Sequence, residues 1–175
     1  TYVSRNVQSN VTVTAGTSNA SLSISKGSDE FHYSPTLSTV QKQTITIIPD
    51  ASIFADDNIN GNGTITTVSG NNIVTGQNTN FLTTVKPGDY IQALTFRGQV
   101  KSVANNTSLT LVDEAGTSVT DEAATLFFPA NVPIPLDRSD RTAQIVGNNL
   151  EIDLGVVVSS SQQATVSYNI RKSVD

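Results

Sequence analysis

The sequence contains no cysteine, methionine or tryptophan, and only 14% of its residues are charged. The absence of cysteine excludes disulfide bonds, thiolate nucleophiles and cysteine-based zinc sites together. Lysine and arginine number 10 against 15 acidic residues, and no segment concentrates them, so the basic surface that nucleic-acid binding requires is missing. No apolar run approaches the ~20 residues of a membrane-spanning helix, and no signal peptide is recognisable. We therefore expect neither nucleic acid nor membrane as a partner.

The residue types that are abundant favour strands and turns. Serine, threonine and asparagine dominate the composition, whereas alanine, leucine, lysine and glutamate, which build helices, are scarce. The 175 residues suffice for one large or two small domains. Since the chain begins at Thr1 and has no methionine, we expect it to be a trimmed or excised part of a longer product. The composition predicts an all-β protein.

Alternation of apolar and hydroxyl residues predicts strands in both flanks of the chain. The segments 11–14, 21–25 and 44–48 alternate in the first flank, and 144–146, 150–154 and 164–170 alternate in the last. Three strands are too few to close a sandwich, but the six together are enough. The only helix candidate lies near residues 120–126.

The centre of the chain differs from the flanks. Short strands follow one another closely there, between a polar, turn-rich segment at 56–63 and a proline-rich segment with Pro129, Pro133 and Pro135. We therefore predict an Ig-like β-sandwich from residues 1–57 and 128–175, with residues 58–127 inserted as a small β-barrel or meander. The competing arrangement is a tandem of three weakly separate pieces.

The central turns and core carry specific expectations. Gly70 and Gly76 fall where tight turns need a positive φ or no side chain. In Pro87-Gly88-Asp89, proline and glycine suit a type II turn, and the aspartate can accept its backbone N–H groups. A small core is expected from Phe81, Leu82, Ile91 and Leu109.

The central segment carries a pattern of glycines, short apolar strands and a Pro-Gly-Asp turn over about fifty residues. The residues of this pattern are Gly63-Thr64-Ile65, Gly70, Val74, Gly76, Thr79, Phe81, Pro87-Gly88-Asp89, Ile91, Val100, Ser102-Val103 and Ser108-Leu109-Thr110-Leu111. The pattern resembles a β module that recurs in bacteriophage tail, baseplate and fibre proteins, and the strand at 164–170 is similar to the closing strand of sandwich domains in large myophage baseplate proteins. The resemblance implies a structural role in the virion and brings no catalytic residue.

One pattern points to a metal. Asp56, Asn58 and Asn60, followed by Gly61, match the first half of a calcium-binding loop. The twelfth position of that pattern is Thr67, where the loop needs a bidentate glutamate. We therefore treat these residues as a weak calcium candidate within a polar linker, and we expect no metal and no cofactor.

The sequence gives little support for a catalytic site. His32 is the only histidine, and no Gly-x-Ser-x-Gly motif accompanies it, so we interpret it as part of a strand-edge aromatic cluster. The carboxylate pairs Asp113-Glu114 and Asp121-Glu122 lie among polar residues, without the apolar surroundings of a glycosidase acid. We interpret both pairs as solvated loop charges.

These observations predict a non-enzymatic virion protein, a β-sandwich module of a phage tail or baseplate. Its expected partners are other phage structural subunits in an oligomeric assembly. The alternative is a bacterial surface adhesin or a carbohydrate-binding β-sandwich module, which leaves a glycan partner open.

Overall fold

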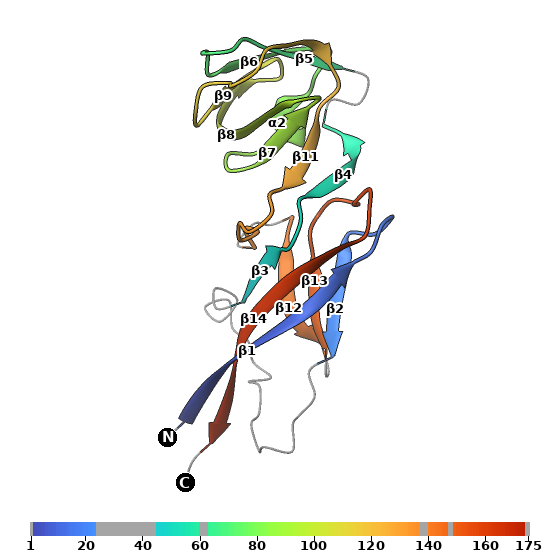
Figure 1. The fold of residues 1–175 in the computed structure, drawn as a ribbon, viewed down its shortest axis with the longest axis vertical. Coiled ribbons are helices and arrows are strands. Elements are labelled where there is room, and N and C mark those ends of the chain that lie inside the picture. The colour runs from blue at the N-terminus through green and yellow to red at the C-terminus, as the bar shows by residue number, and fades with distance from the viewer. Residues whose placement is uncertain (1, 24–44, 60–62, 137–139, 147–148, 174–175) are drawn as a thin grey trace. The chain divides into compact units, whose positions relative to one another are not determined.

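The computed structural model describes residues 2–23, 45–59, 63–136, 140–146 and 149–173, and these residues are almost all in β-strands or the turns between them (Figure 1). The predicted all-β class is confirmed. The strands are β1 (Tyr2–Val13), β2 (Asn19–Ser23), β3 (Thr46–Pro49), β4 (Ile53–Asn58), β5 (Thr64–Thr67), β6 (Ile73–Gln77), β7 (Tyr90–Ala93), β8 (Phe96–Asn105), β9 (Ser108–Leu111), β10 (Val119–Glu122), β11 (Thr125–Phe128), β12 (Thr142–Val146), β13 (Asn149–Asp153) and β14 (Gln162–Ser173); the short helix α2 is Phe81–Thr84.

The structure divides the chain into two compact units. Unit 1 combines Thr1–Ile53 with Pro129–Asp175, and unit 2 is the intervening Phe54–Phe128. Unit 2 therefore begins four residues before the start predicted at residue 58 and ends one residue after the end predicted at 127. Independent folding of each unit remains a prediction.

Unit 1 is a sandwich of two three-stranded sheets, with strand orders β1-β14-β3 and β12-β13-β2. Each strand contributes alternate apolar side chains to a shared interior, as half-buried strands do. The buried residues of the first sheet include Val11, Val13, Ile47, Ala164 and Val166, and those of the second include Ala20, Ala143, Leu150 and Ile152.

The longest pairing in unit 1 joins the first and last strands of the chain. β1 and β14 are antiparallel from Tyr2 opposite Ser173 to Val13 opposite Gln162, so the two chain ends lie side by side (Figure 1). At the other end of β14, Ala164 pairs with Pro49 of β3. The backbone amide of Asn131 donates to the Pro49 carbonyl at 2.9 Å, so the chain leaves for unit 2 and returns from it at this second end.

Unit 2 is an eight-stranded curled sheet with the order β10-β5-β6-β9-β8-β7-β11-β4. Phe81, Ile91 and Leu109 are fully buried in it, as predicted, together with Phe96 and Leu111. The prediction for Leu82 is wrong, because α2 directs Phe81 inward and leaves Leu82 59% exposed.

Two predicted secondary-structure assignments are also wrong. The segment expected to form a helix at 120–126 instead contains the end of β10 and the start of β11, where Val119 pairs with Thr67 and Thr125 pairs with Gln92. The linker expected from residue 56 is partly a strand. Ile53 and Ala55 alternate inward in β4, and the amide of Ile59 donates to the Ala124 carbonyl at 2.8 Å. Tertiary pairing outweighed local polarity in both segments.

Candidate functional site

The calcium candidate does not form a loop where the structure describes it. Asp56 and Asn58 lie in β4, and extended backbone separates their Cα atoms by about 6.6 Å, whereas a calcium loop curls its ligands around one ion. Asn60 lies outside the described residues. Among the residues that the structure describes, no group of three or more His, Cys, Asp or Glu side chains gathers to hold a metal.

The other candidate side chains are dispersed. Asp113 and Glu114 are exposed in the turn after β9, and Asp121 is exposed in β10 with a positive φ of 54°. Glu122 is half-buried opposite Ile65. His32 lies outside the described residues. Nothing in this arrangement brings a nucleophile, a base and an acid together.

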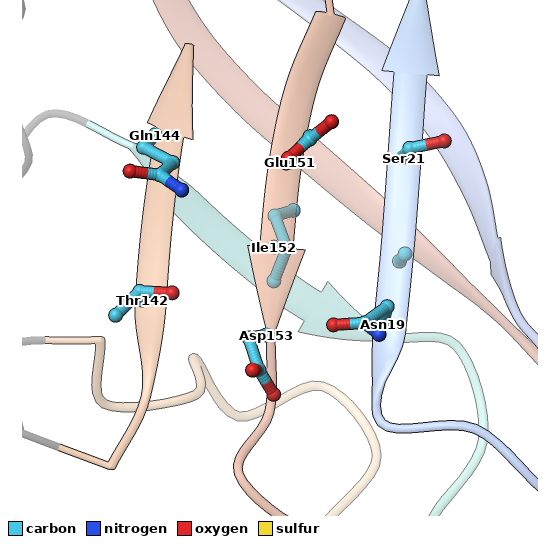
Figure 2. Close-up of a pocket in the computed structure, with 8 residues that line it drawn as sticks. Asn19, Ser21, Thr142, Gln144, Glu151, Ile152 and Asp153 are labelled. Atoms are coloured by element: carbon cyan, nitrogen blue, oxygen red, sulfur yellow. The ribbon is translucent and has the colours of Figure 1, made fainter. Parts of the chain in front are cut away.

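A polar hollow lies instead on the outer face of the sheet β12-β13-β2 (Figure 2). Its volume is about 390 Å³, and every residue that lines it belongs to unit 1. Strand alternation explains its composition, because Leu150 and Ile152 point into the core and leave Glu151 and Asp153 outside. We call this feature the acidic hollow; its lining residues are Asn19, Ala20, Ser21, Thr142, Gln144, Glu151, Ile152 and Asp153.

Strand register arranges the polar side chains of the acidic hollow in two rows. Asp153 on the middle strand lies between Thr142 of β12 and Asn19 of β2. Glu151 lies two residues along the same strand, about 6.7 Å away, and Figure 2 shows it between flanking polar side chains from both neighbours. Each carboxylate is therefore flanked on both sides by an amide or a hydroxyl; in the second row these are Gln144 and Ser21.

Among the described residues that line the acidic hollow there is no lysine or arginine. Asp153 uses one carboxylate oxygen to accept the amide of Gly155 at 2.9 Å, which fixes the turn after β13. Glu151 is exposed. Two carboxylates and two amide carbonyls make the hollow rich in hydrogen-bond acceptors. Such a site suits a cationic group that carries several N–H donors.

Unit 2 presents a different surface feature, an aromatic cluster with one cation. The rings of Phe54 and Phe127 stack at 5.5 Å, and Tyr90 meets Phe127 edge to face at 5.9 Å. The guanidinium carbon of Arg97 lies 5.4 Å from the Phe54 centroid and 5.3 Å from the Phe127 centroid. Because Arg97 already covers both rings, we interpret the cluster as a structural contact that stabilises the pairing of β4 with β11 and not as a binding site.

Sequence reasoning missed the acidic hollow. The alternation in 150–154 is enough to place Glu151 and Asp153 on the outer face of one strand. The hollow also needs polar side chains from the neighbouring strands β12 and β2. Asn19 and Asp153 are 134 positions apart in the chain, and only the register of β2 on β13 brings them together.

Comparison with models of protein families, with curated proteins and with solved structures found no match for this chain. No helix among the described residues is long and apolar enough to cross a membrane.

Proposed function

We propose that this chain is a non-enzymatic structural module of a bacteriophage tail or baseplate, acting through protein–protein interfaces in the virion. The resemblance of its central segment to a recurrent phage β module supports this assignment. The observation that carries it is the layout of unit 1. From Ser173, beside Tyr2, to Ala164, beside Pro49, β14 runs nine residues, or about 30 Å. β14 is thus the continuous central strand of one sheet of unit 1, paired with β1 on one side and with β3 on the other, which is the kind of frame that a structural module uses.

The outer faces of unit 1 also suit an assembling module. The β1-β14-β3 sheet presents a polar face in which side chains bond across strands. Gln163 donates to the Thr12 hydroxyl at 2.6 Å, and Asn6 donates to the Ser167 hydroxyl at 3.0 Å. Such bonds between neighbouring strands hold the face in a fixed shape, which an interface requires.

Mass spectrometry of purified phage particles tests the proposal. Peptides of this chain should appear at a constant ratio to the main tail subunits through successive purification steps. Immunogold labelling should place them on the tail or baseplate. Peptides recovered only from the host-cell envelope would contradict the proposal.

The second candidate is a carbohydrate-binding or adhesin module, and the acidic hollow is the observation that favours it. Its amides, hydroxyls and carboxylates are groups that bind sugar hydroxyls. It ranks second because the described residues that line the hollow include no aromatic side chain that could stack on a sugar ring. A glycan-array screen tests it, with the variant Glu151→Gln/Asp153→Asn as the control that should lose any specific response.

A further inference from the structure

Three exposed apolar side chains gather on three neighbouring strands of unit 2. Val68 follows β5, Ile73 begins β6 and Val112 follows β9, and they are 55%, 38% and 48% exposed. β6 lies between β5 and β9 in the sheet, and Ile73 pairs with Thr110 of β9. In the part of the chain that the structure describes, only three other large apolar side chains are exposed, so half of them lie here. We call Val68, Ile73 and Val112 the apolar band.

Strand alternation puts the apolar band on one face, the outer face of the sheet. In each of the three strands the residue next to the band is buried in the core, namely Thr67, Val74 and Leu111, at most 1% exposed. Neighbouring residues of a strand point to opposite faces, so the band points outward. The rest of this outer face consists of hydroxyl and amide side chains, which are Thr64, Thr66, Thr75, Gln77, Ser108 and Thr110.

Hydrogen bonds hold together the loops that follow β5 and β9. The amide of Gly70 donates to the Ala115 carbonyl at 2.9 Å, and the amide of Ala115 donates to the Asn71 carbonyl at 2.9 Å. The amide of Ser69 donates to the Ser118 hydroxyl at 2.9 Å. The end of the outer face is therefore ordered before any partner binds, which lowers the entropic cost of binding.

The charged residues of the surrounding strands are arranged on either side of β6. The three strands β5, β6 and β9 contain no charged residue. On one side of them, β10 contains Asp121 and Glu122 and no basic residue; on the other side, β8 contains Arg97 and Lys101 and no acidic residue. In the strand order β10-β5-β6-β9-β8, an acidic and a basic strand therefore flank three neutral strands, with β6 at the centre.

We infer that the apolar band is the contact between two copies of this chain, packed outer face to outer face about a two-fold axis along β6. This axis places β5 of one copy against β9 of the other, so Val68 meets the stretch from Thr110 to Val112, and Ile73 meets its own counterpart. It also places the acidic β10 of each copy beside the basic β8 of the other. The charge pattern is therefore self-complementary, as an isologous interface requires.

The size of the contact predicts a weak interaction. The sheet of unit 2 is curled, so only its middle strands can approach those of a second copy. Small interfaces bind weakly, and we expect a dissociation constant on the order of 0.1 mM. In an assembly that holds copies at a fixed spacing, the raised effective concentration would make the contact form. The inference rests on the proposed role as an assembling module and assigns that role an interface.

Sedimentation equilibrium of the full chain at concentrations up to about 1 mM tests the inference. Wild type should show a monomer–dimer equilibrium. Ile73→Lys and Ile73→Asp should each weaken association at least about tenfold, because the two-fold axis brings the two introduced like charges together. An equimolar mixture of these two variants should associate again, because the introduced charges in a mixed dimer are opposite.

The matched control is Leu82→Lys, which changes an apolar side chain that is 59% exposed in unit 2 but lies on α2, outside this face. It should leave association unchanged, whereas Val112→Lys should weaken it and replaces the Ile73 variants if circular dichroism shows that they do not fold. A wild-type chain that stays monomeric would overturn the inference, as would folded band variants that still dimerise. A mixture of the two Ile73 variants that stays monomeric would do the same, because residue 73 would then not face its own counterpart. The virion measurement is independent of this contact, so either result can fail without the other.

Discussion

The backbone amide of Ala130 donates a hydrogen bond to the side-chain hydroxyl of Ser52 at 3.3 Å. These residues flank the whole of unit 2, since one precedes Ile53 and the other follows Pro129. The chain therefore leaves unit 1 and re-enters it at neighbouring points, which is the geometry of an inserted domain.

Replacing residues 54–128 with a short Gly/Ser linker should leave a folded sandwich. The two ends already lie side by side, so the linker adds only loop-closure entropy, on the order of a kcal/mol or two. Amide NMR spectra of the shortened chain should be well dispersed, and unit 2 expressed alone should also fold, with lower stability. A collapsed, undispersed spectrum from the shortened chain would show that the two units need one another.

Gly155→Ala should destabilise unit 1 more than Gly16→Ala does. Both glycines have a positive φ, +75° and +78°, so both substitutions carry backbone strain of about 1–2 kcal/mol. Only at position 155 would the new Cβ collide with backbone, at the carbonyl of Asp140, whereas Gly16 faces open space. Urea denaturation of the two variants measures the difference, and equal losses would contradict this explanation.

Thr67→Val should cost about 1–3 kcal/mol of unfolding free energy. Thr67 is 1% exposed, and its hydroxyl donates to the Thr117 carbonyl at 2.8 Å and accepts the Val119 amide at 3.1 Å. Valine keeps the shape and leaves both backbone groups without this partner. Thr64→Val, on the same strand but half-buried, is the control and should be nearly neutral. Chemical denaturation of both variants decides it.

Arg97→Ala should destabilise unit 2 by about 1–2 kcal/mol, because an exposed cation–π contact is worth ~0.5–1 kcal/mol and Arg97 makes two. Lys101→Ala removes an exposed cation from the same strand, β8, and should change stability little. Thermal melts followed by circular dichroism compare the two. A Lys101 variant as unstable as the Arg97 variant would mean that net charge, rather than ring contact, is responsible.

Calcium should matter little to stability. The candidate residues lack the bidentate glutamate and lie along an extended strand, so their affinity for calcium should be low. Because weak binding stabilises the folded state little, millimolar calcium should shift the melting temperature by no more than about one degree. A melt in the presence of EDTA is the control. A shift of about ten degrees would show that Asp56 belongs to a real metal site.

Several local features were predictable because short-range physics decides them. Gly70 and Gly88 have φ values of 80° and 93°, the positive values that their turns suggested. Asp89 accepts the backbone amide of Lys86 at 2.8 Å, as the Pro87-Gly88-Asp89 sequence predicts. Gly76 was predicted for a turn but lies in β6, and what requires glycine there is the nearness of the Thr79 and Phe81 side chains. The conformation of a turn depends on a few consecutive residues, whereas the space around a side chain depends on which other residues the fold places next to it.

The sequence by itself determined the all-β class and the faces of the strands, because alternation every second residue separates core from solvent wherever a strand forms. Leu150 and Ile152 inside, with Glu151 and Asp153 outside, follow from that rule. Only the tertiary structure decided which strands are neighbours. The pairing of β2 with β13 and of β1 with β14 spans more than a hundred residues, and no local pattern specifies a register across that distance. The acidic hollow is a product of the first of these two registers.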